Sequence, residues 1–135
     1  MTIPDSTTVP PLVQAEALVK AQQFPAALQI LNQCLKAQPN DRQCLYLKAV
    51  CHRYLQDVSQ AIGTLSTLLA THPEYARGYQ ELGHCYRIQT KFPEAINAYQ
   101  MAVQLHPGLL ASWQQLSHLF AALNEPTLVR EAQDK

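Results

Sequence analysis

The sequence carries little charge and no excess of either sign. Its 135 residues include ten basic and ten acidic side chains, so the formal net charge is zero and only 15% of the residues are charged. An average soluble domain has roughly 25% charged residues. Nucleic-acid-binding domains generally present a basic stripe, which this balance does not supply, so we expect no nucleic-acid partner. Sixteen glutamines provide much of the polar surface instead.

Long hydrophobic runs are also missing. No apolar run approaches the roughly 20 residues that a transmembrane helix needs. The first residues, MTIPDSTTVPP, have neither the basic region nor the apolar core of a secretory signal. We therefore expect a cytoplasmic protein that does not bind membranes, with a flexible N-terminus at residues 1–8 followed by a folded domain at residues 9–135.

Glycine and cysteine are few and form no known chemical motif. The four glycines make no phosphate-binding loop, and the chain contains no nucleophile elbow and no zinc-protease motif. The four cysteines form no C-x-x-C pair, and they are Cys34, Cys44, Cys51 and Cys85. We expect them to be reduced, buried, small apolar residues. The sequence thus predicts no catalytic residue, no metal site and no cofactor.

A repeat of 34 residues is the strongest feature of the sequence. Small residues and helix-ending prolines recur at this spacing, namely Ala27, Ala61 and Ala95, and Pro39, Pro73 and Pro107. A fixed period of this length is typical of stacked helical repeats, in which neighbouring units share one core. We predict units at residues 8–41, 42–75, 76–109 and 110–135, the last of them partial.

Each unit is predicted to contain two helices. In the third unit, apolar and small residues follow helical spacing at Tyr79, Leu82, Gly83 and Tyr86. Pro93 suits the first turn of a second helix, and Pro107 ends it. Small residues such as Gly83 and Ala95 are expected where the two helices cross closely.

These positions resemble the tetratricopeptide repeat (TPR). The third unit carries the resemblance best, with Tyr79, Leu82, Gly83, Tyr86, Ala95, Tyr99, Ala102 and Pro107. The second unit matches at Leu45, Ala49, Ala61, Leu65 and Pro73. The resemblance implies an all-α, TPR-like superhelix of antiparallel helix pairs, with three full repeats and a partial fourth. It also implies a protein-interaction module that binds a peptide or partner segment in a concave groove.

The resemblance places the groove on the outward positions of the first helix of each unit. The candidate groove residues are Tyr46, Val50, Arg53, Tyr54, Arg77, Gln80, His84, Arg87, Gln114 and His118. Arg53 and Arg87 are 34 residues apart, so a regular stack would turn both toward the same groove. Three arginines, with Glu16 as the one acidic candidate, would attract carboxylates. We therefore expect an acidic or C-terminal peptide as the ligand.

One TPR variant, the carboxylate clamp of co-chaperones, is not expected here. Of the five clamp positions counted from the first unit, only Arg77 has a suitable side chain; Leu12, Glu16, Leu47 and Glu81 stand at the others. Two histidines, His84 and His118, also lie 34 residues apart, but a metal ion would need further ligands. A disulfide between Cys51 and Cys85 would require closer helices than usual.

Two alternative functions stay open at this point. The chain could be a regulatory or substrate-docking region of a larger enzyme, as in TPR-linked sulfotransferases, because the fourth unit ends abruptly. It could also be a scaffold that associates with itself through the last helices, where Trp113, Phe120, Leu128 and Val129 are apolar.

Overall fold

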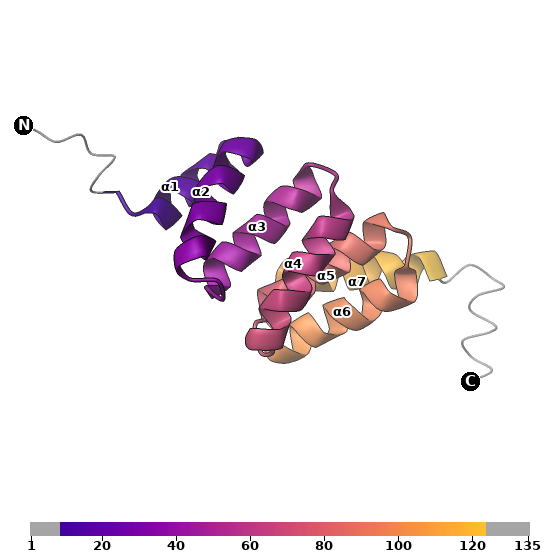
Figure 1. Cartoon of the computed structure of the whole chain (residues 1–135). Coiled ribbons are helices and arrows are strands. Elements are labelled where there is room, and N and C mark those ends of the chain that lie inside the picture. Colours follow the sequence, from indigo (N-terminus) through magenta and orange to yellow (C-terminus); the bar gives the residue numbers. More distant parts are fainter. Residues whose placement is uncertain (1–8, 124–135) are drawn as a thin grey trace, which may run out of the picture. The chain divides into compact units, whose positions relative to one another are not determined.

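The structure is a computed structural model that describes residues 9–123, and in this range it contains seven α-helices and no strand (Figure 1). The helices are α1 (Pro11–Lys20), α2 (Phe24–Ala37), α3 (Arg42–Tyr54), α4 (Val58–Thr71), α5 (Ala76–Ile88), α6 (Phe92–Leu105) and α7 (Leu110–Leu123). The prediction of an all-α helical-repeat fold is confirmed. The predicted flexible segment 1–8 and the end of the fourth unit lie outside the described residues.

Helices and predicted units follow the same period. The predicted units 8–41, 42–75 and 76–109 each contain two helices, and α7 lies in the fourth. Both helices of a pair run antiparallel (Figure 1). The chain forms two compact units, residues 1–73 and residues 74–135, and each is described by itself below. Among residues 9–123, no helix combines the length and the apolar character needed to cross a bilayer.

The first compact unit has a core shared by α1, α2 and α3. Its buried members are Ala15, Ala27, Leu31, Cys44, Leu47 and Cys51. Ala15 and Ala27 are fully buried, and their small side chains allow α1 and α2 to pack closely. The core therefore contains residues from both the first and the second predicted repeats, as expected for repeats that cannot bury their apolar faces alone.

The second compact unit is built around Tyr99 of α6, which has no exposed surface. A Cβ atom added to Gly83 of α5 would lie 2.7 Å from two carbons of the Tyr99 ring. The sequence predicts that Gly83 and Ala95 lie where the two helices cross closely. In the structure the Tyr99 ring occupies the space beside Gly83. Position 83 therefore requires glycine, because a Cβ atom would clash with this ring.

The turn between the two helices of a pair has the same backbone geometry in all three repeats. Gln22, Gln56 and Thr90 have positive φ angles of 61°, 66° and 59°. The N–H of the next residue reaches back to the helix, as in the 2.9 Å bond from Lys91 N to the carbonyl oxygen of Tyr86. These are the bonds of a Schellman motif, which normally has glycine at the positive-φ position.

Candidate functional site

In the first compact unit, a side-chain hydrogen bond connects α1 to α3, the helix that carries four predicted groove residues. Gln43 Nε2 donates a hydrogen bond of 3.4 Å to Glu16 Oε2, which joins the two first helices. Tyr46 is half-buried and packs against the core of this unit. Val50, predicted as a surface position, is instead buried with 7% of its surface exposed. Val50 is therefore not an outward position. Helix α3 packs against α1, α2 and α4, so much of its surface is covered.

Arg53 and Tyr54 belong to a stack of three side chains at the end of α3. The Tyr54 ring lies parallel to the ring of Phe24, with centroids 4.8 Å apart and 4° between the planes. The guanidinium carbon of Arg53 lies 4.4 Å from the centroid of the same Tyr54 ring. A cation at this distance is attracted by the ring electrons. The stack thus presents a partly exposed cationic and aromatic surface, since Tyr54 is 54% exposed.

In the second compact unit, the predicted groove residues His84 and Arg87 meet at the hydroxyl group of Tyr99. His84 Nδ1 lies 2.6 Å from this oxygen, and Arg87 Nε donates to it over 3.4 Å. The rings of His84 and Tyr99 also pack edge to face, with centroids 5.4 Å apart. A buried phenol therefore holds a histidine and an arginine of α5 in fixed positions.

The Tyr99 hydroxyl is the shared partner of this cluster. Arginine has only donors, so the hydroxyl oxygen accepts from Arg87 Nε. The direction of the bond between Tyr99 and His84 Nδ1 depends on the tautomer of His84. The Arg87 guanidinium has further N–H donors beside the His84 ring, and a guanidinium is a group that recognises carboxylates.

The other groove residues of this unit lie on α5 and α7. Gln80 Oε1 accepts a hydrogen bond of 2.7 Å from the hydroxyl of the buried Ser112, which links these two helices. Arg77, Gln114 and His118 are exposed. Their exposure is compatible with the predicted groove, but Arg53 and Arg87 belong to different compact units, so their sharing of one groove stays a prediction.

The groove residues predicted from the repeat register do not include Phe24 or Tyr99. Tyr99 stands on the apolar stripe of its helix, where the sequence predicts packing. The hydroxyl group was the available signal for Tyr99, since a buried tyrosine oxygen usually finds a hydrogen-bond partner. For Phe24 the sequence gives no such signal.

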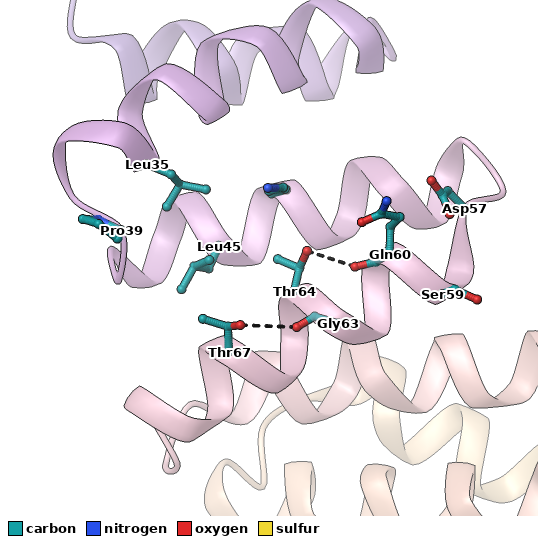
Figure 2. Close-up of a pocket in the computed structure, with 10 residues that line it drawn as sticks. Leu35, Pro39, Leu45, Asp57, Ser59, Gln60, Gly63, Thr64 and Thr67 are labelled. Carbon is teal, nitrogen blue, oxygen red and sulfur yellow. Dashed lines mark hydrogen bonds between the residues drawn. The ribbon is translucent and has the colours of Figure 1, made fainter.

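A separate cavity of about 620 Å³ lies in the first compact unit, beside α3 and α4. Figure 2 shows that Thr64 and Thr67 turn back onto their own helix, where their hydroxyls donate to the carbonyl oxygens of Gln60 and Gly63 over 2.9 Å and 3.4 Å. These hydroxyl protons are thus used within α4. None of the predicted groove residues lines this cavity.

An apolar groove of about 510 Å³ lies on α6 and α7. Trp113 and Phe120 line it and are 47% and 44% exposed. These are two of the four residues proposed for self-association; the other two, Leu128 and Val129, lie outside the described residues. Trp113 is oriented by a 2.8 Å hydrogen bond from its Nε1 to the carbonyl oxygen of Pro107.

Metal ligands do not gather in the part of the chain that the structure describes. Across residues 9–123, no three histidine, cysteine or acidic side chains come together as a possible metal site. Cys51 and Cys85 are both buried and lie in different compact units. Burial raises the pKa of the Cys51 thiol to about 11, as expected for a thiol that serves as a small apolar residue.

Comparisons with known proteins match most of the helical region. A family model described as tetratricopeptide repeat matches residues 52–109. A second model, described as anaphase-promoting complex, cyclosome, subunit 3, matches residues 11–68. No curated protein matches the chain in sequence.

Solved structures of low sequence identity share the fold. The first TPR domain of human RPAP3 has a TM-score of 0.79 and 18% identity, covering 84% of this chain and 89% of that one. MamA from Desulfovibrio magneticus RS-1 has a TM-score of 0.75 and 23% identity, covering 92% and 71%. The Arabidopsis OM64 TPR domain has a TM-score of 0.74 and 16% identity, covering 78% and 87%.

Proposed function

Because this chain belongs to the tetratricopeptide repeat family, we propose that it is a protein-interaction module that binds an acidic peptide or partner segment. The candidate binding residues are outward positions of the first helices, chiefly His84 and Arg87 in the second compact unit; Arg53 and Tyr54 are the candidates in the first. The role involves no catalytic step and no cofactor. The absence of nucleotide-binding and hydrolase motifs from the sequence supports this part of the proposal.

The observation that carries the proposal is the cluster of His84, Arg87 and the buried Tyr99. Ordered donors bind an anion at a smaller entropic cost than donors on mobile side chains. Tyr99 holds both partners through its hydroxyl oxygen, at 2.6 Å and 3.4 Å. Arg77, exposed on the same helix, adds a second positive charge.

The structural comparisons support a peptide ligand of this class. A related structure is described as the first TPR of Spaghetti (RPAP3) bound to the HSP90 peptide SRMEEVD, which ends in acidic residues. The chain shares 17% identity with that protein. Only Arg77 matches the carboxylate clamp, so we propose recognition of acidic peptides through the His84 and Arg87 cluster instead.

A binding experiment with defined peptides tests the proposal. Short peptides rich in Asp and Glu, SRMEEVD among them, are compared with analogues in which each acid is replaced by its amide. We expect the acidic peptides to bind more tightly and their affinity to fall as salt is added, because the contacts are between charges. Arg87→Glu should weaken binding roughly tenfold or more, since it replaces a charge-assisted contact with repulsion.

Lys36→Glu is the matched control, because it makes the same charge change at an exposed position on α2, a second helix. Its affinity for acidic peptides should stay close to that of the unaltered chain. If no acidic peptide binds better than its amide analogue, or if Arg87→Glu binds as well as Lys36→Glu, the proposal is wrong.

A further inference from the structure

Cys34 and Cys44 lie at matched positions on two antiparallel helices of the first compact unit. Cys34 is three residues before Ala37, where α2 ends, and Cys44 is two residues after Arg42, where α3 begins. At 1.5 Å of rise per residue, both lie within about one helical turn of the connection between the helices. The 34-residue register pairs Cys51 with Cys85 instead, because these two stand at equivalent positions in successive repeats.

The side chains of these two cysteines share one small space. Both line a cavity of about 310 Å³, together with Asp41 and Pro11. Cys34 also packs against the buried cluster of α1, α2 and α3 that contains Cys44. Both residues are thiols in this structure. The Cys34 side chain is also close enough to hydrogen-bond the Cys44 thiol, and a disulfide requires such close side chains.

The two thiols differ in accessibility and environment. Cys34 is half-buried, whereas Cys44 is 4% exposed. Asp41 caps α3 by accepting a hydrogen bond of 3.0 Å from the backbone N–H of Cys44. Burial, the Asp41 carboxylate and the neighbouring Cys34 together raise the pKa of the Cys44 thiol far above its usual value. Cys44 is therefore a poor first nucleophile, and the more accessible Cys34 is the thiol that an oxidant reaches first; Cys44 reacts afterwards through its small thiolate fraction.

We propose that Cys34 and Cys44 are a reversible redox pair that closes into a disulfide when the chain meets a peroxide. In the first step the sulfur of Cys34 attacks hydrogen peroxide, which gives a sulfenic acid and one water. The sulfur of Cys44 then displaces the hydroxyl group from Cys34, the S–S bond forms, and a second water leaves with the Cys44 proton. A dithiol reductant returns both thiols by exchange.

The bond would link the first repeat to the second. α2 belongs to the predicted unit 8–41 and α3 to unit 42–75, so the disulfide joins successive repeats across the nine residues 35–43. Closing even a short loop restricts the unfolded chain. We therefore expect the melting temperature of the oxidised chain to rise by roughly 5 °C. A melting temperature that stays the same or falls would contradict this consequence.

Peptide mapping of the whole chain tests the pair directly. The reduced protein is treated with hydrogen peroxide, alkylated, and digested with trypsin without reduction. Cleavage after lysine and arginine places the four cysteines in four different peptides, at residues 21–36, 43–48, 49–53 and 78–87. We expect a cross-linked species of peptides 21–36 and 43–48, lighter by two hydrogen atoms than their sum, which disappears on reduction.

Two variants separate this pair from the other thiols. Cys34→Ser removes the half-buried partner and should abolish the cross-link and the rise in melting temperature. Cys51→Ser removes a buried cysteine outside the cavity and should leave the cross-link intact. The cross-link itself is read from mapped peptides, so this readout does not depend on equal stability of the variants.

The alternative outcomes are distinct on the same map. Overoxidation of Cys34 without a cross-link, a link between two Cys34 residues of different molecules, or a link to Cys51 would each overturn the proposal. So would the persistence of all four thiols after peroxide treatment. Peptide binding by the Arg87 cluster is independent of these results.

Discussion

Two helical glycines, Gly83 and Gly63, have different surroundings, and we expect the same substitution to affect stability differently at each. Gly83 lies against the Tyr99 ring, which a Cβ atom would approach to 2.7 Å. Gly63, inside α4, has nothing within 4 Å of the same added atom. The intrinsic preference for alanine over glycine in a helix is about 1 kcal/mol at both positions. Only the neighbouring side chain differs.

Gly83→Ala and Gly63→Ala should therefore change stability in opposite directions. Gly83→Ala displaces the buried Tyr99 ring, so we expect the free energy of unfolding to fall by about 1–2 kcal/mol despite the better helix propensity. Gly63→Ala should raise it by up to about 1 kcal/mol. Urea denaturation of both variants measures the difference. Equal stabilisation by the two substitutions would contradict this prediction, because it would mean that the Tyr99 ring moves aside without loss of stability.

His52 makes a pH-dependent contribution to stability. Its Nδ1 lies 4.0 Å from Asp57 Oδ2, and its buried Nε2 has no hydrogen-bond partner among residues 9–123. Burial lowers the pKa of His52 below its usual 6.5, and Lys48 lowers it further, although the Asp57 carboxylate acts in the opposite direction. Below pH 6.5 the unfolded chain thus binds this proton more readily than the folded chain.

The free energy of unfolding should consequently decrease as the pH falls through 6.5 toward the lowered pKa. We expect His52→Gln to lose less stability than the unaltered chain between pH 7.5 and 5.5, by a fraction of a kcal/mol. Urea denaturation at the two pH values measures this. Both proteins contain the other histidines, so the contributions of these to the pH dependence cancel in the comparison. A larger loss of stability in His52→Gln than in the unaltered chain would contradict the role given to His52.

At the scale of the element, the turns within the three helix pairs have the same backbone conformation although their residues differ. The positive-φ positions carry glutamine twice and threonine once, at Gln22, Gln56 and Thr90. Left-handed backbone is costly for residues with a Cβ atom, and a branched Cβ adds to the crowding. The turns form nonetheless, because they reverse the chain direction and so allow the two helices of a pair to pack against each other.

Thr90→Gly should raise the free energy of unfolding by about 1 kcal/mol, because glycine adopts this conformation without the steric cost. The same change at Thr71, the last residue of α4, should be destabilising. Thr71 is helical, and its hydroxyl oxygen lies 3.1 Å from the carbonyl oxygens of both Thr67 and Leu68, which share its single proton. Thermal unfolding of the two variants is the measurement, and a loss of stability in Thr90→Gly would refute this account of the turn.

At the scale of the whole molecule, each compact unit carries one of the two candidate arginines, Arg53 in the first and Arg87 in the second. The double charge reversal Arg53→Glu with Arg87→Glu tests whether Arg53 contributes to peptide binding. If it does, the double variant should lose more affinity than either single variant. The peptide assay of the proposed function, extended to these three proteins, measures the difference. A double variant no weaker than Arg87→Glu would confine the ligand to the second unit.

The 34-residue period by itself determined the helix pairs and the fold class, because small and apolar residues recur at the positions where helices must touch. The same register selected His84 and Arg87. It could not indicate that a buried Tyr99 joins them, that Val50 is covered, or that Cys34 and Cys44 share a cavity. Those features depend on the distances between side chains of different helices, and only the packed tertiary structure sets these distances.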